Sequence, residues 1–250
     1  ARFVVGADPT AIEAVWRRVY STGFGQRPDI TLVAILSGLE IARWDIAGKA
    51  AGKPVWAMLG GRVHERLRAY TYLYPGPGEG ADFYHDAERS AAAAAAAVAQ
   101  GFTAVKFDPA GAYSAFDPRQ PSQRQLERSE RFCRLVRDAV GSRADLLFGT
   151  HGQFTASGAI RLARRLEPSD PLWFEEPTPP ELPEVMARVA RATTIPIATG
   201  ERLATKYEIG RVLATAAASI IQLNLGRCGG ILEGKKIAGM AEAHYAQIAP

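Results

Sequence analysis

The chain has 250 residues, of which 47% are hydrophobic and 22% charged, a composition that is typical of a globular protein and permits one α/β barrel or two smaller domains. The net charge is +4, but the basic residues are interleaved with acidic ones and form no block, which argues against nucleic-acid binding. No apolar run approaches the roughly 20 residues of a membrane span, and no signal peptide opens the chain. Cys133 and Cys228 lack metal-ligand spacing. We therefore expect a cytoplasmic protein with reduced thiols and no membrane association.

The N-terminal quarter of the chain predicts helices. Residues 8–20 form the first, with Asp8 as its cap and Pro9 in its first turn. Residues 30–50 form the second, which is apolar on much of its surface and is therefore expected to be buried. A short helical turn over residues 56–59 follows and stops at two glycines.

From residue 67 onward, short apolar runs alternate with helical segments. The predicted strands are residues 67–74, 103–107, 146–148, 172–174, 195–198, 219–223 and 246–249. The predicted helices are residues 86–100, 122–140, 156–167, 180–193, 204–216 and 231–244. This alternation predicts parallel βαβ units. A closed barrel has about eight strands, and an open sheet leaves unpaired edges, so we expect an incomplete copy of a longer barrel domain.

Polar side chains follow three neighbouring predicted strands, in the segments 149–153, 175–177 and 200–202. In a parallel barrel the carboxyl ends of the strands converge on one face, where catalytic groups lie. Glu175 and Glu201 are carboxylates at two of these ends, and converging carboxylates suit Mg²⁺, a hard cation that takes oxygen ligands. The alternative is a pair of solvated charges at the rim of the barrel.

Three further residues are candidates for acid–base chemistry. Lys106 and Asp108 are two positions apart and share one face of a strand. Lys106 either transfers a proton or binds an anionic substrate, and the alternative for this pair is a structural salt bridge. His151 follows a strand, and a histidine side chain is suited to acid–base work near neutral pH. Its alternative is a structural role, which we also assign to the histidines at 64, 85 and 244.

A polar turn near the C-terminus has a structural and a functional interpretation. Asn224 follows an apolar strand, and it either orients a catalytic partner or caps the strand end. The glycine-rich residues 226–230 lead into a helix, where backbone N–H groups can bind an anion. They lack the spacing of a phosphate-binding loop, so a tight strand-to-helix turn is the favoured interpretation.

Taken together, the order of these motifs resembles the mandelate racemase/muconate lactonizing branch of the enolase superfamily, over nearly the whole chain. Within that branch, the chain is most similar to the sugar-acid dehydratases. The motifs that carry the resemblance are residues 37–45 (SGLEIARWD), 48–49 (GK), 59–61 (LGG), 105–108 (VKFD), 174–177 (FEEP), 200–203 (GERL) and 229–230 (GG).

The resemblance implies an α/β fold, a modified TIM-type (β/α)7β barrel with part of an α+β capping domain, incomplete at both ends. Residues 1–66 would be the partial helical capping domain and residues 67–250 the incomplete barrel. A bound Mg²⁺ would hold a substrate carboxylate and stabilise the enediolate that forms when a base removes the neighbouring proton. Glu175 and Glu201 match two of three metal ligands. Lys106 and Asp108 match the acid–base positions of the second strand, and His151 matches a third-strand histidine that helps to expel a hydroxyl group.

Three departures from the family pattern bear on the chemistry. Glu201 lies 26 positions after Glu175, and the same step back leads to Gly149, where the family usually has a metal-binding Asp. Gly149 has no side chain, so the site would be weak, would use His151 or water, or would be lost. Asn224 stands where the family often has an Asp that orients a catalytic histidine. By this resemblance that histidine would follow Pro250, and we expect the part of the cap that supplies specificity loops to precede the first residue.

Our first functional hypothesis is a Mg²⁺-dependent dehydratase of a sugar acid, a carbon–oxygen lyase whose partner is a small carboxylate substrate. The alternatives are a racemase or cycloisomerase that forms the same enediolate from a 2-hydroxy acid, and an enolase-like protein or fragment without activity. We expect a homo-oligomer and no organic cofactor.

Overall fold

The computed structural model describes residues 2–26, 28–111 and 119–250. The chain forms two compact units: unit 1 contains Ala1–Leu67, Gly200–Leu213 and Ile221–Pro250, and unit 2 contains Arg68–Thr199 and Ala214–Ile220. The predicted division into a cap over residues 1–66 and a barrel over residues 67–250 stays a prediction. Among the described residues, no helix combines the length and the apolar character that a membrane span requires.

A parallel sheet is the framework of the fold, as the sequence predicts. In the described part of the chain it has seven strands in sequence order, from β1 to β7. The strands are β1 (Thr71–Tyr72), β2 (Ala104–Phe107), β3 (Asp145–Gly149), β4 (Trp173–Glu175), β5 (Ile197–Thr199), β6 (Ile220–Ile221) and β7 (Gln247–Ile248). The pairs from β1 to β5 are parallel, which confirms the α/β class. β1 is much shorter than the strand predicted over residues 67–74.

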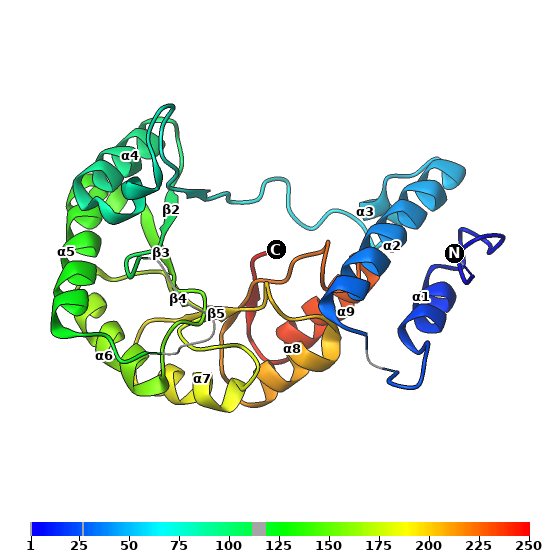
Figure 1. Cartoon of the computed structure of the whole chain (residues 1–250). Coiled ribbons are helices and arrows are strands. Elements are labelled where there is room, and N and C mark those ends of the chain that lie inside the picture. The colour runs from blue at the N-terminus through cyan, green and yellow to red at the C-terminus, as the bar shows by residue number, and fades with distance from the viewer. Residues whose placement is uncertain (1, 27, 112–118) are drawn as a thin grey trace. The chain divides into compact units, whose positions relative to one another are not determined.

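Helices follow the strands of unit 2 and lie along one side of them (Figure 1). They are α4 (Ala87–Ala99), α5 (Gln123–Val140), α6 (Ala156–Leu166) and α7 (Pro183–Ala190), with short 3₁₀ turns at η1 (Ala81–His85), η2 (Gly141–Arg143) and η3 (Glu167–Ser169). Side chains of Asp86, Ser122 and Thr155 accept backbone N–H bonds at the starts of α4, α5 and α6. These caps satisfy donors that have no partner inside the helix.

The two faces of the sheet in unit 2 have different chemistry. Successive side chains of a strand point to opposite faces. Phe107, Phe148 and Phe174 form a chain of ring contacts on one face, and Phe107 stacks on Phe132 of α5 with ring centroids 5.5 Å apart. Because these rings bury the helix-facing side, the alternate residues of the same strands are left for the opposite face. That opposite face carries the polar residues of the candidate site.

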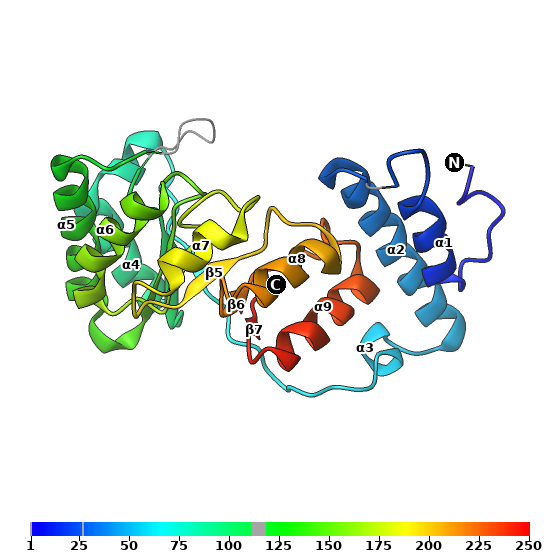
Figure 2. The ribbon, with the colours of Figure 1, turned by 90° about the horizontal axis from the view of Figure 1, so that it is seen from below.

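Unit 1 is mainly helical (Figure 2). It contains α1 (Ile12–Tyr20), α2 (Ile30–Ala51), α3 (Val55–Met58), most of α8 (Thr205–Ala214), α9 (Ile231–Ala243) and β7. The prediction that Asp8 caps the first helix is wrong, because α1 begins at Ile12 and has Ala11 at its N-cap. The Asp8 carboxylate is instead engaged in a local turn, where Oδ1 accepts bonds from the backbone N–H and the hydroxyl of Thr10.

α2 matches its predicted range, but its buried side combines apolar with polar residues. Glu40 and Arg43 are buried, whereas Ile35 and Ile46 are 59% and 45% exposed. Asp29 caps the helix, and Gly52 ends it in a left-handed conformation. The expectation that the apolar surface of this helix is buried is therefore correct only in part, because Val33 and Leu36 are buried but other large apolar residues are exposed.

The buried residue Glu40 joins α2 to the start of α9. Glu40 Oε2 accepts the N–H of Ile231 at 2.7 Å, and Oε1 accepts the N–H of Leu232 at 2.9 Å and Trp44 Nε1 at 2.7 Å. A Cβ at Gly230 would overlap this carboxylate. A side chain of the protein itself thus occupies this helix N-terminus, and residues 226–230 form the tight turn that the sequence favoured.

We expect the contribution of Glu40 to stability to depend on pH. Burial raises the pKa of Glu40 above its ordinary value of 4.5, and the bonds from Leu232, Ile231 and Trp44 oppose this shift. The folded state then holds a proton that the unfolded state has lost, so this contribution is complete below pH 4.5 and decreases as the pH rises through the folded pKa. Urea unfolding should show that Glu40→Gln destabilises the protein more at pH 4 than at pH 8.

The exposed Glu242→Gln on α9 is the matched control, and it should show no such difference between the two pH values. An equal loss from Glu40→Gln at both pH values would contradict the assignment.

Candidate active site

The carboxyl ends of β2, β3 and β4 bring four of the predicted site residues together in unit 2. Lys106 lies in β2 and Asp108 directly follows this strand. His151 follows β3, which ends at Gly149, and Glu175 ends β4. The strand register places Gly149 opposite Glu175. Lys106 is opposite Leu147, two residues before Gly149, so it lies on the same face.

Lys106 and Glu175 form a buried ion pair across β3. Lys106 Nζ lies 2.7 Å from Glu175 Oε1, and the two side chains are only 12% and 3% exposed. The second oxygen, Oε2, accepts Trp173 Nε1 at 3.2 Å. The lysine reaches over the intervening strand beside Gly149, where its Cε would lie 3.6 Å from a Cβ. The side chain of Lys106 thus passes Gly149 at an ordinary contact distance on its way to Glu175.

Asp108 links β1 to the histidine after β3. Its Oδ2 accepts the Tyr72 hydroxyl at 2.8 Å and lies 3.5 Å from His151 Nδ1, which is too long for a short hydrogen bond. Burial raises the pKa of Asp108, while His151 and the Tyr72 bond act in the opposite direction. Burial and the nearby Asp108 also raise the pKa of Tyr72, so its hydroxyl remains a donor.

The loop that carries His151 is fixed to the end of β4. Thr150 is buried, and its hydroxyl donates to the carbonyl oxygens of Glu175 and Glu176. The N–H of Gly152 donates to the carbonyl of Glu176 at 2.7 Å. His151, between them, has a φ of 50°, in the left-handed region that few residues other than glycine adopt. This anchored, strained turn holds the imidazole at the Asp108 carboxylate.

The remaining sequence candidates lie outside this group. Glu201 belongs to unit 1, and its pairing with Glu175 around a metal stays a prediction. Asn224, also in unit 1, accepts the N–H of Gly226 at 2.9 Å through Oδ1, which agrees with the capping alternative. Within the described ranges, no three side chains from His, Cys, Asp or Glu are arranged as a ready metal cluster.

The residues of unit 2 nevertheless have the chemistry that Mg²⁺ requires. Glu175 supplies a buried carboxylate. Asp108 Oδ1 is buried and has no hydrogen-bond partner, although buried carboxylate oxygens normally have one. Both are hard oxygen donors. The donor set therefore fits Mg²⁺ in kind, with Lys106 as the present counter-charge of Glu175.

Two residues of this site, Tyr72 and Trp173, were not predicted from the sequence. Tyr72 was assigned only to an aromatic strand, and Trp173 only to an apolar one. The register pairs Tyr72 with Lys106, which places the tyrosine beside the polar face. The sequence did show a tyrosine two residues before the end of a predicted strand. Its place at the site follows only when the neighbouring strand and the register between the two are known.

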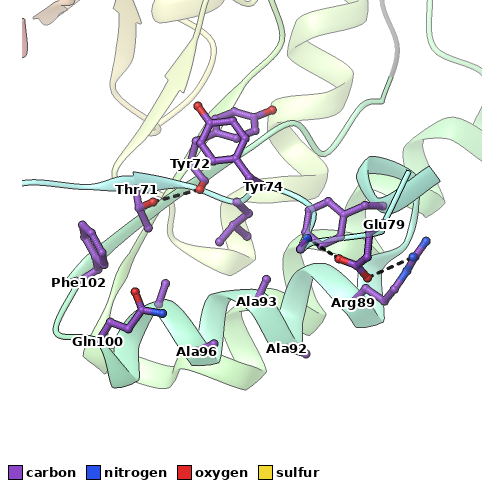
Figure 3. Close-up of a pocket in the computed structure, with 14 residues that line it drawn as sticks. Thr71, Tyr72, Tyr74, Glu79, Arg89, Ala92, Ala93, Ala96, Gln100 and Phe102 are labelled. Carbon is purple, nitrogen blue, oxygen red and sulfur yellow. Dashed lines mark hydrogen bonds and ion pairs between the residues drawn. The ribbon is translucent and has the colours of Figure 1, made fainter. Parts of the chain in front are cut away.

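A separate groove lies between β1 and α4, with a volume of about 570 Å³. In Figure 3, Tyr72 and Tyr74 point away from α4, and the alanines at 92, 93 and 96 present only methyl groups. Its charged residues, Glu79 and Arg89, pair with each other at 3.3 Å. This groove offers no reactive group and is not a second candidate for catalysis.

Two family models match the chain. The model described as the enolase C-terminal domain-like family matches residues 89–250. The model described as the mandelate racemase/muconate lactonizing enzyme N-terminal domain matches residues 1–60. Together they cover most of the chain.

Solved structures and curated relatives agree with these matches. A crystal structure from Labrenzia alexandrii DFL-11, assigned to the mandelate racemase/muconate lactonizing enzymes, is 67% identical with a TM-score of 0.94, over 98% of this chain and 62% of that one. The D-galactonate dehydratase of Variovorax paradoxus is 36% identical over 99% of this chain and 61% of that protein. That of Ralstonia nicotianae is 37% identical over 100% and 62%. The chain thus spans about six-tenths of the length of these relatives.

Proposed function

The chain belongs to the mandelate racemase/muconate lactonizing enzyme family of the enolase superfamily, and we propose that it acts as a Mg²⁺-dependent dehydratase of a sugar acid, through an enediolate intermediate. The observation that carries the proposal is the grouping of Lys106, Asp108, His151 and Glu175 around Gly149 at the strand ends. The similarity to two D-galactonate dehydratases supports an aldonate as the class of substrate.

Dehydration of a sugar acid needs two proton transfers. A base removes the proton from the carbon beside the carboxylate, and an acid protonates the hydroxyl that leaves the next carbon. The resulting enol rearranges to a 2-keto acid, so water is the only other product. Mg²⁺, held by Glu175 with Glu201, would neutralise the charge that develops on the substrate carboxylate.

We assign the role of acid to His151. Its Nδ1 lies 3.5 Å from the Asp108 carboxylate, and an imidazole is the side chain that most often supplies the proton in general acid catalysis. Its backbone is held by the β3–β4 contacts, so the ring can donate from a fixed position. Tyr72, which donates to the same carboxylate, positions Asp108.

Lys106 better fits the binding of an anion than the removal of a proton. An ammonium group 2.7 Å from a buried carboxylate is a hydrogen-bond donor, whereas a base must be an uncharged amine. We therefore propose that Lys106 holds the substrate carboxylate close to Glu175. The residue that removes the proton is not among the four grouped side chains in this assignment.

The test is a screen of aldonates with the full-length protein and Mg²⁺, in which formation of a 2-keto acid is measured. We expect one or more aldonates to give a 2-keto product. Glu175→Gln should abolish this product and greatly weaken Mg²⁺ binding in calorimetry, because it removes a carboxylate ligand.

The matched control is Glu127→Gln on the exposed side of α5, which should leave both measurements unchanged. An epimerised acid without 2-keto product would support the racemase alternative instead. If the wild-type protein binds no Mg²⁺ and turns over no acid, the interpretation as an enolase-like protein without activity would replace the proposal.

A further inference from the structure

Gly149 is the position at which the family pattern expects a metal-binding carboxylate, and a neighbouring carboxylate already fills the space in front of it. A Cβ built on Gly149 would lie 2.8 Å from Asp108 Oδ1, closer than real Cβ atoms approach another atom. The next atoms, Lys106 Cε and His151 Cε1, would be at ordinary contact distances of 3.6 and 3.9 Å. Asp108 is therefore the group that excludes a side chain at position 149.

The two oxygens of Asp108 have different surroundings. Oδ2 accepts the Tyr72 hydroxyl and faces His151. Oδ1, the oxygen beside Gly149, is buried and has no hydrogen-bond partner. A buried carboxylate oxygen without a partner is rare in native proteins, and an absent ion is one of its ordinary explanations. The free oxygen thus lies where the side chain of a third-strand ligand would begin.

The position of Glu175 supports a shared ligand role. Glu175 is opposite Gly149 in the strand register, so the space in front of Gly149 borders the predicted metal ligand on β4. Lys106, which contacts Glu175, also passes this space. His151 is a weaker candidate, since Mg²⁺ prefers carboxylate and water oxygens to imidazole nitrogen.

We propose that Asp108, through Oδ1, replaces the third metal ligand that is missing at Gly149, so that the ligand comes from the end of β2 instead of the end of β3. This inference rests on the proposed Mg²⁺-dependent function and specifies its metal site. The steric arrangement agrees with this exchange, because glycine at 149 makes room for Asp108, and a longer residue at 149 would require the Asp108 carboxylate to move.

The test is a set of variants in which Mn²⁺, as a spectroscopic substitute for Mg²⁺, is titrated into the full-length protein and bound Mn²⁺ is measured by electron paramagnetic resonance. Loss of a residue that hydrogen-bonds to a metal ligand typically weakens metal affinity by about 10- to 100-fold. Asp108→Asn removes the charge of a proposed ligand itself, so it should weaken Mn²⁺ affinity by about 100-fold or more. Gly149→Asp alone should also bind poorly, because its side chain meets Asp108.

The decisive variant combines Gly149→Asp with Asp108→Ala, which moves the carboxylate from β2 to β3. The atom nearest to a Cβ at 149 is then gone, so Mn²⁺ affinity should return to within roughly 10-fold of wild type. Asp138→Asn, on the exposed side of α5, is the matched control and should bind as wild type does. Circular dichroism shows whether each variant is folded.

The outcomes separate this inference from the proposed function. Wild-type protein that binds Mn²⁺, with Asp108→Asn binding it equally well, would overturn the role of Asp108 and leave the Mg²⁺-dependent function standing. Loss of binding in His151→Asn, with Asp108→Asn unaffected, would assign the ligand to the histidine. Wild-type protein without any Mn²⁺ affinity would overturn both proposals together.

Discussion

Lys106→Met should destabilise the protein by about 3–5 kcal/mol in the presence of a chelator, because it leaves the Glu175 carboxylate buried without its counter-charge. Glu175 is only 3% exposed, so water cannot replace the ammonium group. The Trp173 indole alone would remain as a donor to this carboxylate. The free energy of unfolding, measured by circular dichroism in urea, checks the size of the loss.

A double variant isolates the ion pair from the packing of the lysine chain. Lys106→Met with Glu175→Gln removes both charges, so most of the lost stability should return. Lys49→Met is the matched control, because Lys49 also pairs with a carboxylate, at 2.7 Å from Asp45, but is 77% exposed. Its loss should be much smaller, since exposed pairs are screened by water. Equal losses from Lys106→Met and Lys49→Met would contradict the importance of the buried pair.

His151→Asn should reduce the turnover number for dehydration by about 10²- to 10⁴-fold, the contribution that a positioned acid makes to proton transfer. Asparagine keeps a polar group in the turn but cannot supply a proton. Because His151 is proposed to act on the leaving hydroxyl and not on the carbon acid, exchange of the substrate's α-proton with deuterated solvent should continue. Measuring product formation and deuterium incorporation in the same sample checks both expectations.

His64→Asn is the control for this substitution, since His64 is exposed and lies in unit 1. It should change neither rate. If His151→Asn abolishes both dehydration and proton exchange, the histidine removes the α-proton instead of protonating the hydroxyl. Dehydration at the wild-type rate would remove His151 from the mechanism.

The sequence predicted the site unevenly. It identified Lys106, Asp108, His151 and Glu175, because polar residues after apolar strands are visible in a linear pattern. For Lys106 and Asp108 it left open a structural salt bridge or a role in the chemistry, and the structure pairs Lys106 with Glu175 instead. The catalytic and metal-binding roles of these residues, the pairing with Glu201, the cytoplasmic location and the homo-oligomeric state remain predictions.

Helix starts were also harder to predict than helix positions. A capping residue is recognised by its type, but its partner depends on where the backbone turns. Asp8 has the right type and bonds to a turn instead of to α1. Glu40, in the middle of α2, caps α9 across 191 positions of sequence, which no local pattern indicates.

The sequence by itself determined the alternation of strands and helices, the face shared by Lys106 and Asp108, and the glycine at position 149. These follow from periodicity and side-chain type, which are local properties of the chain. Only the tertiary structure decided which residues of neighbouring strands lie opposite each other. That register places Asp108 Oδ1 in front of Gly149, Tyr72 beside Lys106 and Glu175 opposite Gly149. The sequence shows only that position 149 has no carboxylate. The fold shows that the carboxylate of Asp108 lies in the space in front of it.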